Sequence, residues 1–134
     1  MSGAAYVPVE ICLGALPEFH EEPKVYDLTG VPGGAKEMLV YTFVTVKGEE
    51  DNFQRGYYEI STADGSIQYT QYMNVAAGKD IVVLNSANLW LPMGEGKLKL
   101  KLVCADCAKG KKSIKGATPK DKEWSNVFII GYRA

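Results

Sequence analysis

Cys104 and Cys107 stand at C-x-x-C spacing, and this pair comes closer to a chemical site than any other stretch of the sequence. A zinc ion needs four such ligands, and the other candidates are Cys12 and the single histidine, His20. A redox role would need the motif at a helix N-terminus, which lowers a thiol pKa, and no helical pattern follows it. We expect ordinary thiols at a strand end, with no metal and no cofactor. A disulfide between Cys104 and Cys107, or a metal site with Cys12 and His20, stays open.

Six lysines lie in the segment 109–122, directly after the cysteine pair. Clustered cations can bind phosphate groups or nucleic acid by releasing counterions. This segment has no arginine and no aromatic residue, so it lacks bidentate and stacking contacts to bases. We do not expect nucleic acid as a partner. The segment is predicted to be a solvated loop in which Lys111, Lys112 and Lys115 could dock on an acidic protein surface.

Catalytic residues are sparse. The one histidine, His20, stands among three glutamates in "EFHEE" and has no nucleophile motif beside it. The sequence contains no G-x-S-x-G, no H-E-x-x-H and no glycine-rich phosphate loop. We therefore expect that the protein is not an enzyme.

Two other stretches have residue types suited to recognition. The loop 48–56, "GEEDNFQRG", combines acidic oxygens with Phe53 and Arg55, a mixture that could bind calcium or a sugar. A predicted hairpin directly after it is rich in tyrosine, and exposed tyrosines suit interfaces and ligand platforms. The tyrosines of this hairpin are Tyr57, Tyr58, Tyr69 and Tyr72.

Length and composition indicate one globular domain over residues 1–134. The chain is 46% hydrophobic and 23% charged, which excludes the disordered and collagen-like classes. No apolar run reaches the roughly 20 residues that a membrane-spanning helix needs. The first residues lack a basic n-region, so we expect no signal peptide. The location is unknown from sequence, with a virion or the cytoplasm favoured.

The hydrophobic pattern is that of β-strands almost throughout. "LKLKLV" at 98–103 alternates apolar residues with lysine, as a strand with one solvent-exposed face does. Asp64-Gly65 separates two further strand patterns and suits a tight hairpin turn. No apolar stripe of helical period and length occurs. The chain is predicted to be all-β, an antiparallel β-sandwich or jelly roll of about eight to nine short strands.

The segment 38–47, "MLVYTFVTVK", is apolar at both odd and even positions. This pattern predicts a central strand that is covered on both faces. The residues expected in the core are Leu39, Val40, Tyr41, Phe43, Val44, Leu98, Leu100, Leu102, Phe128 and Ile130.

The last apolar stretch, "NVFIIGYRA", resembles the final strand of the jelly rolls of the TNF/C1q class. The likeness concerns the order of features, and no motif specific to that class is present. It implies a trimer with aromatic residues at its axis, and it implies nothing about a ligand.

The two halves of the chain carry opposite charge. The halves could neutralise each other within the fold, which we favour, or an acidic face of one copy could meet a basic face of the next. Residues 1–66 have 11 acids and 4 bases (−7), and residues 67–134 have 5 acids and 11 bases (+6). We expect a non-enzymatic structural protein that self-associates, with a trimer favoured, or packs on a larger scaffold, as a viral coat or decoration protein does. The alternative is a carbohydrate-binding, lectin-like module that uses the loop 48–56 and the tyrosine hairpin.

Overall fold

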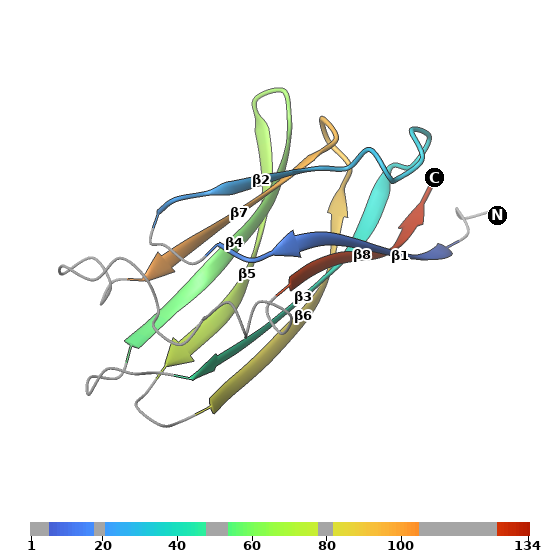
Figure 1. The fold of residues 1–134 in the computed structure, drawn as a ribbon. Helices are drawn as coiled ribbons and strands as arrows, with labels where there is room; N and C mark the ends of the chain where they lie inside the picture. The colour runs from blue at the N-terminus through green and yellow to red at the C-terminus, as the bar shows by residue number, and fades with distance from the viewer. Residues whose placement is uncertain (1–5, 18–20, 48–53, 78–81, 105–125) are drawn as a thin grey trace.

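The computed structural model describes residues 6–17, 21–47, 54–77, 82–104 and 126–134 (Figure 1). These residues form eight antiparallel strands in two four-stranded sheets, and the same residues contain no helix. The strands are β1 (Tyr6–Ala15), β2 (Lys24–Asp27), β3 (Glu37–Lys47), β4 (Gln54–Asp64), β5 (Ile67–Ala77), β6 (Val82–Pro92), β7 (Lys97–Cys104) and β8 (Asn126–Arg133). The expectation of an all-β chain is confirmed. The strand β6 runs without a break from Val82 to Pro92.

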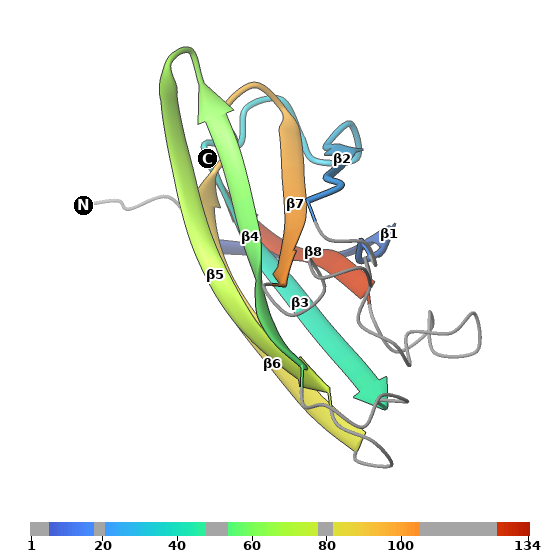
Figure 2. The same cartoon turned by 90° about the vertical axis from the view of Figure 1, so that its left-hand side faces the viewer.

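The first sheet has the strand order β1-β8-β3-β6, and the second has the order β2-β7-β4-β5 (Figures 1 and 2). Each strand of the first half of the chain pairs with the matching strand of the second half in reverse order: β1 with β8, β2 with β7, β3 with β6 and β4 with β5. The chain therefore runs as one long antiparallel ribbon that is folded into two sheets.

The core lies between the two sheets and draws on both. In β7 the alternation of the sequence is reproduced, because Leu98, Leu100 and Leu102 are fully buried while the intervening lysines lie on the other side of the strand. In the first sheet Val40 and Ile129 are fully buried. Together with their neighbours they form one continuous hydrophobic cluster.

The strand β3 is central, as predicted, but the expectation that both of its faces are deeply buried is wrong. Its even-numbered residues point inward, and Met38 and Val40 have no exposed surface. Leu39, Tyr41 and Phe43 lie on the outer side of the sheet and are half-buried, as are Phe128 and Ile130 in β8. These outer side chains owe their partial burial to one another and not to a further layer of described residues.

The hairpin between β4 and β5 is confirmed, and its turn lies one residue later than Asp64-Gly65. Asp64 pairs with Ile67, so Gly65 and Ser66 are the two turn residues. Gly65 has a φ of 62°, which places glycine at the first central position, as in a type II′ turn.

Polar links join the two sheets on the side of the molecule where β1 and β2 lie. The Tyr26 hydroxyl of β2 donates to the Ala15 carbonyl of β1 at 2.5 Å, and the Lys24 ammonium donates to the same oxygen at 3.0 Å. Burial raises the pKa of the Tyr26 hydroxyl well above its ordinary value. The hydroxyl therefore stays protonated and remains a hydrogen-bond donor at neutral pH.

Candidate functional site

The outer face of the first sheet carries aromatic side chains from four strands. Register places Leu39 opposite Trp90, and Tyr41 opposite Phe128. Side chains of directly opposite residues point to the same side of a sheet. We call this surface the aromatic face, and its members are Tyr6, Leu39, Tyr41, Phe43, Trp90 and Phe128.

At one end of the aromatic face three rings lie in a row. The rings of Phe43 and Phe128 are stacked, with centroids 5.9 Å apart and an angle of 16° between their planes. The Tyr41 ring lies 5.6 Å from that of Phe43. Because each ring covers part of its neighbour, all three are half-buried without any layer above them among the described residues. They form a firm apolar surface.

At the other end the indole of Trp90 is held between two partners. The Arg133 guanidinium lies 3.9 Å from the centre of the Trp90 ring, a distance at which a cation–π interaction is favourable. The Tyr6 ring meets the same indole edge to face at 5.9 Å. Tyr6 also donates a hydrogen bond to the Ile130 carbonyl at 3.0 Å, and a side chain at Gly131 would overlap its ring. Trp90 is therefore fixed in place.

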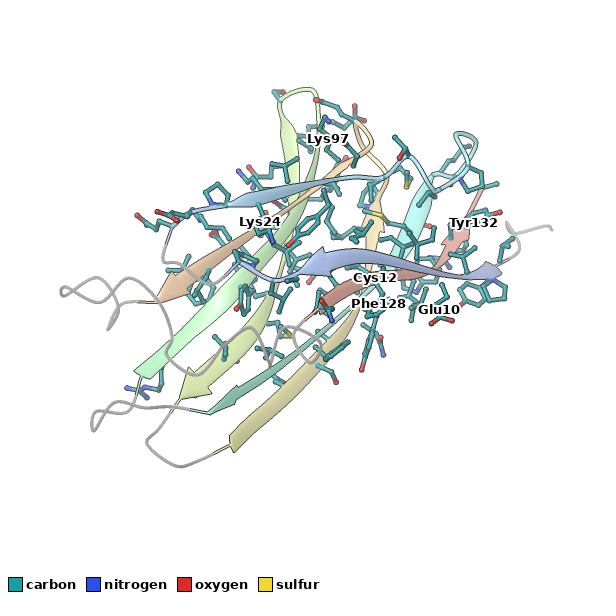
Figure 3. All side chains as sticks on the ribbon, viewed as in Figure 1. Glu10, Cys12, Lys24, Lys97, Phe128 and Tyr132 are labelled. Carbon is teal, nitrogen blue, oxygen red and sulfur yellow. The ribbon has the colours of Figure 1, made fainter. Side chains whose placement is uncertain are left out.

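Charge on the aromatic face is low. Arg133 is neutralised by Glu37, with 3.1 Å between the guanidinium nitrogen and the carboxylate oxygen. Glu10 and Cys12 are exposed on the neighbouring edge strand β1, and Cys12 is a free thiol next to Phe128 in the register (Figure 3). Glu10 is the one acid of β1, and it lies at the margin of the sheet.

The outer face of the second sheet has the opposite character. Lys97, Lys99 and Lys101 alternate along β7 with the buried leucines. Lys97 pairs with Asp27 at 2.5 Å, and Lys101 pairs with Glu59 at 3.4 Å. We call this surface the charged face, and its members are Asp27, Glu59, Lys97, Lys99 and Lys101.

Of the four tyrosines predicted to form a surface, two meet on the outside of the second sheet. Tyr57 and Tyr72 contact each other edge to face at 5.7 Å, and Tyr72 is 58% exposed. Tyr58 is in the core, where its hydroxyl donates to the Pro17 carbonyl at 3.0 Å. Tyr69 is half-buried and packs against the core. Tyr58 and Tyr69 therefore lie on the inner side of the hairpin, opposite to Tyr57 and Tyr72.

The remaining predicted site residues fall mostly outside the described part of the chain. Arg55 is described and is exposed at the start of β4. Phe53 and most of the loop 48–56 lie outside the described residues. The same is true of the three lysines Lys111, Lys112 and Lys115.

The cysteine pair and the single histidine also fall at the margin of the described residues or beyond it. His20 and Cys107 lie outside the described residues, as does the side chain of Cys104. Within residues 6–17, 21–47, 54–77, 82–104 and 126–134, no three His, Cys, Asp or Glu side chains gather to hold a metal ion. The described residues also contain no helix that is long and apolar enough to cross a membrane.

A hollow of about 230 Å³ lies at the end of the charged face. Its lining mixes Lys97 and Lys99 with Glu95, so its charge does not select one kind of ligand. The volume is below the roughly 300–1,000 Å³ of typical ligand pockets. The hollow therefore supports no specific ligand.

Sequence reasoning missed the aromatic face because the segment 38–47 has apolar residues at both odd and even positions, a pattern that predicts a strand covered on both faces. One signal was available: the inward positions of 38–44 include Val40 and Val44, whereas the outward ones include Tyr41 and Phe43. Trp90 and Phe128 join them only through strand pairing. No protein-family model matches the chain, and no curated protein matches it either.

Proposed function

We propose that the protein is a non-enzymatic assembly subunit with a jelly-roll fold, which associates with copies of itself through the aromatic face. The pairing of β1 with β8, β2 with β7, β3 with β6 and β4 with β5 supports the jelly roll, since that fold is a long hairpin wound around one core. Jelly rolls occur in viral capsid proteins and in lectins, so the fold alone does not select a function.

The observation that carries the proposal is the concentration of aromatic rings on one weakly charged outer face. Protein interfaces are enriched in Trp, Tyr, Phe and Arg and depleted of charge at their centre. Trp90, with Arg133 on one side and Tyr6 on another, has the composition of an interaction hot spot. The non-enzymatic part of the proposal rests on the sequence, which has one histidine and no catalytic motif.

The size of the face is compatible with a specific but modest contact. Four strands at a spacing of about 4.8 Å and eight residues at a rise of about 3.3 Å cover roughly 500 Å². Two such faces would bury about 1,000 Å², which is near the lower limit for a specific interface. The face would therefore support either a weak oligomer or one contact of a larger coat. The resemblance to the TNF/C1q class favours three copies.

Light scattering coupled to size-exclusion chromatography tests the proposal. The wild-type protein should have a mass above the 14.6 kDa of one chain. Phe43→Lys places a charge in the middle of the row of three rings on the aromatic face and should lower the association constant at least tenfold. Tyr57→Lys makes the same kind of change on the second sheet and should leave the mass unchanged. Wild-type protein that is monomeric at ~0.5 mM, or association that Phe43→Lys does not weaken, would contradict the proposal.

Carbohydrate recognition is the second candidate, and one observation favours it. Tyr57 and Tyr72 form a partly exposed aromatic pair of the kind on which a sugar ring can pack. Binding on a glycan array by a strictly monomeric protein would favour this function over assembly.

A further inference from the structure

The two sheets have four edge strands, and those on one side of the molecule are protected against pairing with another chain. The edges are β1 and β6 in the first sheet and β2 and β5 in the second. β1 contains Pro8, and its register with β8 shifts twice. β2 has only four residues. Proline, register shifts and short length are devices that prevent an exposed edge from adding a foreign strand.

β5 has none of these devices. It is eleven residues long, "IQYTQYMNVAA", and contains no proline and no charged residue. Its register with β4 is continuous from Gln54 to Asp64. It also carries Ile67 and Tyr72, which are among the most exposed large apolar side chains of the described residues, at 55% and 58%. An edge of this kind is open to strand addition.

The open part of β5 is its first half, 67–72. Toward its end β5 lies beside β6, where the Asn85 amide donates to the Asn74 carbonyl at 2.6 Å. Toward the turn between β4 and β5, β5 and β6 diverge (Figures 1 and 2). No other described strand pairs with the outer edge of β5.

The contact with Asn85 also shows which backbone groups point outward. The Asn74 carbonyl is reached from β6, so it faces away from β4. In an antiparallel ladder the N–H and C=O groups of one residue point to the same side, and successive residues alternate. Gln68, Thr70 and Tyr72 therefore direct their N–H and C=O groups to the free edge.

We propose that the segment 67–72 of β5 pairs in antiparallel fashion with the same segment of a second copy. The β2-β7-β4-β5 sheets of the two copies would then form one continuous sheet. A two-fold axis at Thr70 would place Thr70 opposite its equivalent, and Gln68 opposite Tyr72. The three residues of each copy would then form about six hydrogen bonds between the strands.

A second copy fits this edge better than a charged partner strand. In a strand that pairs with itself, any charge near the axis meets a like charge, which is destabilising, and β5 has no charge. A Thr–Thr pair across the axis is a favourable cross-strand pair. The ring of Tyr72 would gain cover from the Gln68 side chain of the other copy. This contact is separate from the aromatic face, and two different self-contacts on one chain can build an assembly larger than a dimer.

Thr70→Pro tests the pairing, because proline removes the outward N–H and leaves the ladder to β4 intact, as proline at an edge position does. The matched control is Thr70→Val, which keeps the N–H and the β-branched shape. Both are made in a Phe43→Lys background, so that the aromatic face does not contribute. We expect Phe43→Lys and Phe43→Lys/Thr70→Val to be dimers in light scattering. Phe43→Lys/Thr70→Pro should dimerise at least tenfold more weakly.

Amide exchange gives a second readout on the wild-type protein. Protection of the Gln68, Thr70 and Tyr72 amides should rise with protein concentration. If Thr70→Pro fails to fold, Thr70→Lys replaces it as the test variant. It sets two like charges across the axis and should abolish the dimer. A Phe43→Lys protein that is already monomeric, or equal masses for the proline and valine variants, would overturn the pairing. If Thr70 variants change the wild-type mass and Phe43→Lys does not, the edge contact stands and the proposed role of the aromatic face fails.

Discussion

The aromatic face and the charged face lie on opposite outer sides of the same core and differ in what they offer to another molecule. Both are built by strands that turn one set of side chains inward, such as Val40 in β3 and Leu100 in β7. Outside, β3 carries Tyr41 and Phe43, whereas β7 carries Lys99 and Lys101. Water solvates lysine well and aromatic rings poorly, so the charged face is complete in a monomer and the aromatic face gains by being covered.

Among the changes proposed here, truncating a buried leucine of β7 beneath the charged face should lower stability the most. Leu100→Ala removes a fully buried side chain and should lower the free energy of unfolding by about 3 kcal/mol, through lost transfer energy and the cavity left behind. Lys99→Ala, the next residue on the opposite side of the strand, should change it by less than about 0.5 kcal/mol. Urea unfolding followed by fluorescence measures both. Equal losses of unfolding free energy would mean that β7 does not have one buried and one solvent-exposed side.

The same contrast explains which parts of the fold the sequence could predict. In β7 every second residue is lysine, and this alternation fixed the inward side without any knowledge of neighbours. The turn at Gly65 was found because a glycine with positive φ is a local requirement of the hairpin. In β3 both sides carry apolar residues, so the alternation that marks β7 is missing, and the contrast of Val40 and Val44 with Tyr41 and Phe43 was the one signal for the inward side.

The composition of the aromatic face depends on strand pairing, which a single sequence does not contain. Trp90 meets Arg133 only because β6 and β8 both flank β3. The directions of Tyr57 and Tyr58 could have been predicted from the sequence. Tyr58 stands two residues before the apolar Ile60, so the two side chains point to the same, inward side. The β5 edge likewise becomes visible only when the strand order is known.

The aromatic face itself should show an intermediate effect. Trp90→Ala removes the ring on which Arg133 lies and which Tyr6 meets edge to face, and it should lower the free energy of unfolding by about 2 kcal/mol. Asn88→Ala, an exposed position on the same strand and face, should cost less than about 0.5 kcal/mol. Thermal and urea unfolding at low concentration separate this loss from association. If the two variants lose the same stability, the rings of this face contribute nothing within the monomer.

The smallest effect concerns the polar link between the two sheets and depends on pH. Tyr26 is buried, and its hydroxyl donates to the Ala15 carbonyl. Burial raises its pKa above the ordinary value of about 10, so the folded protein holds the proton at a pH where the unfolded chain releases it. This contribution to stability is complete below about pH 10 and is lost as the pH rises further.

Tyr26→Phe should cost about 1 kcal/mol at pH 7 through the lost hydrogen bond, and its stability should fall less steeply than that of the wild type between pH 10 and 11. Tyr72→Phe is the control for a tyrosine on the solvent side and should stay within about 0.5 kcal/mol of the wild type at pH 7. An alkaline decline that is equally steep in Tyr26→Phe and in the wild type would show that another group controls it.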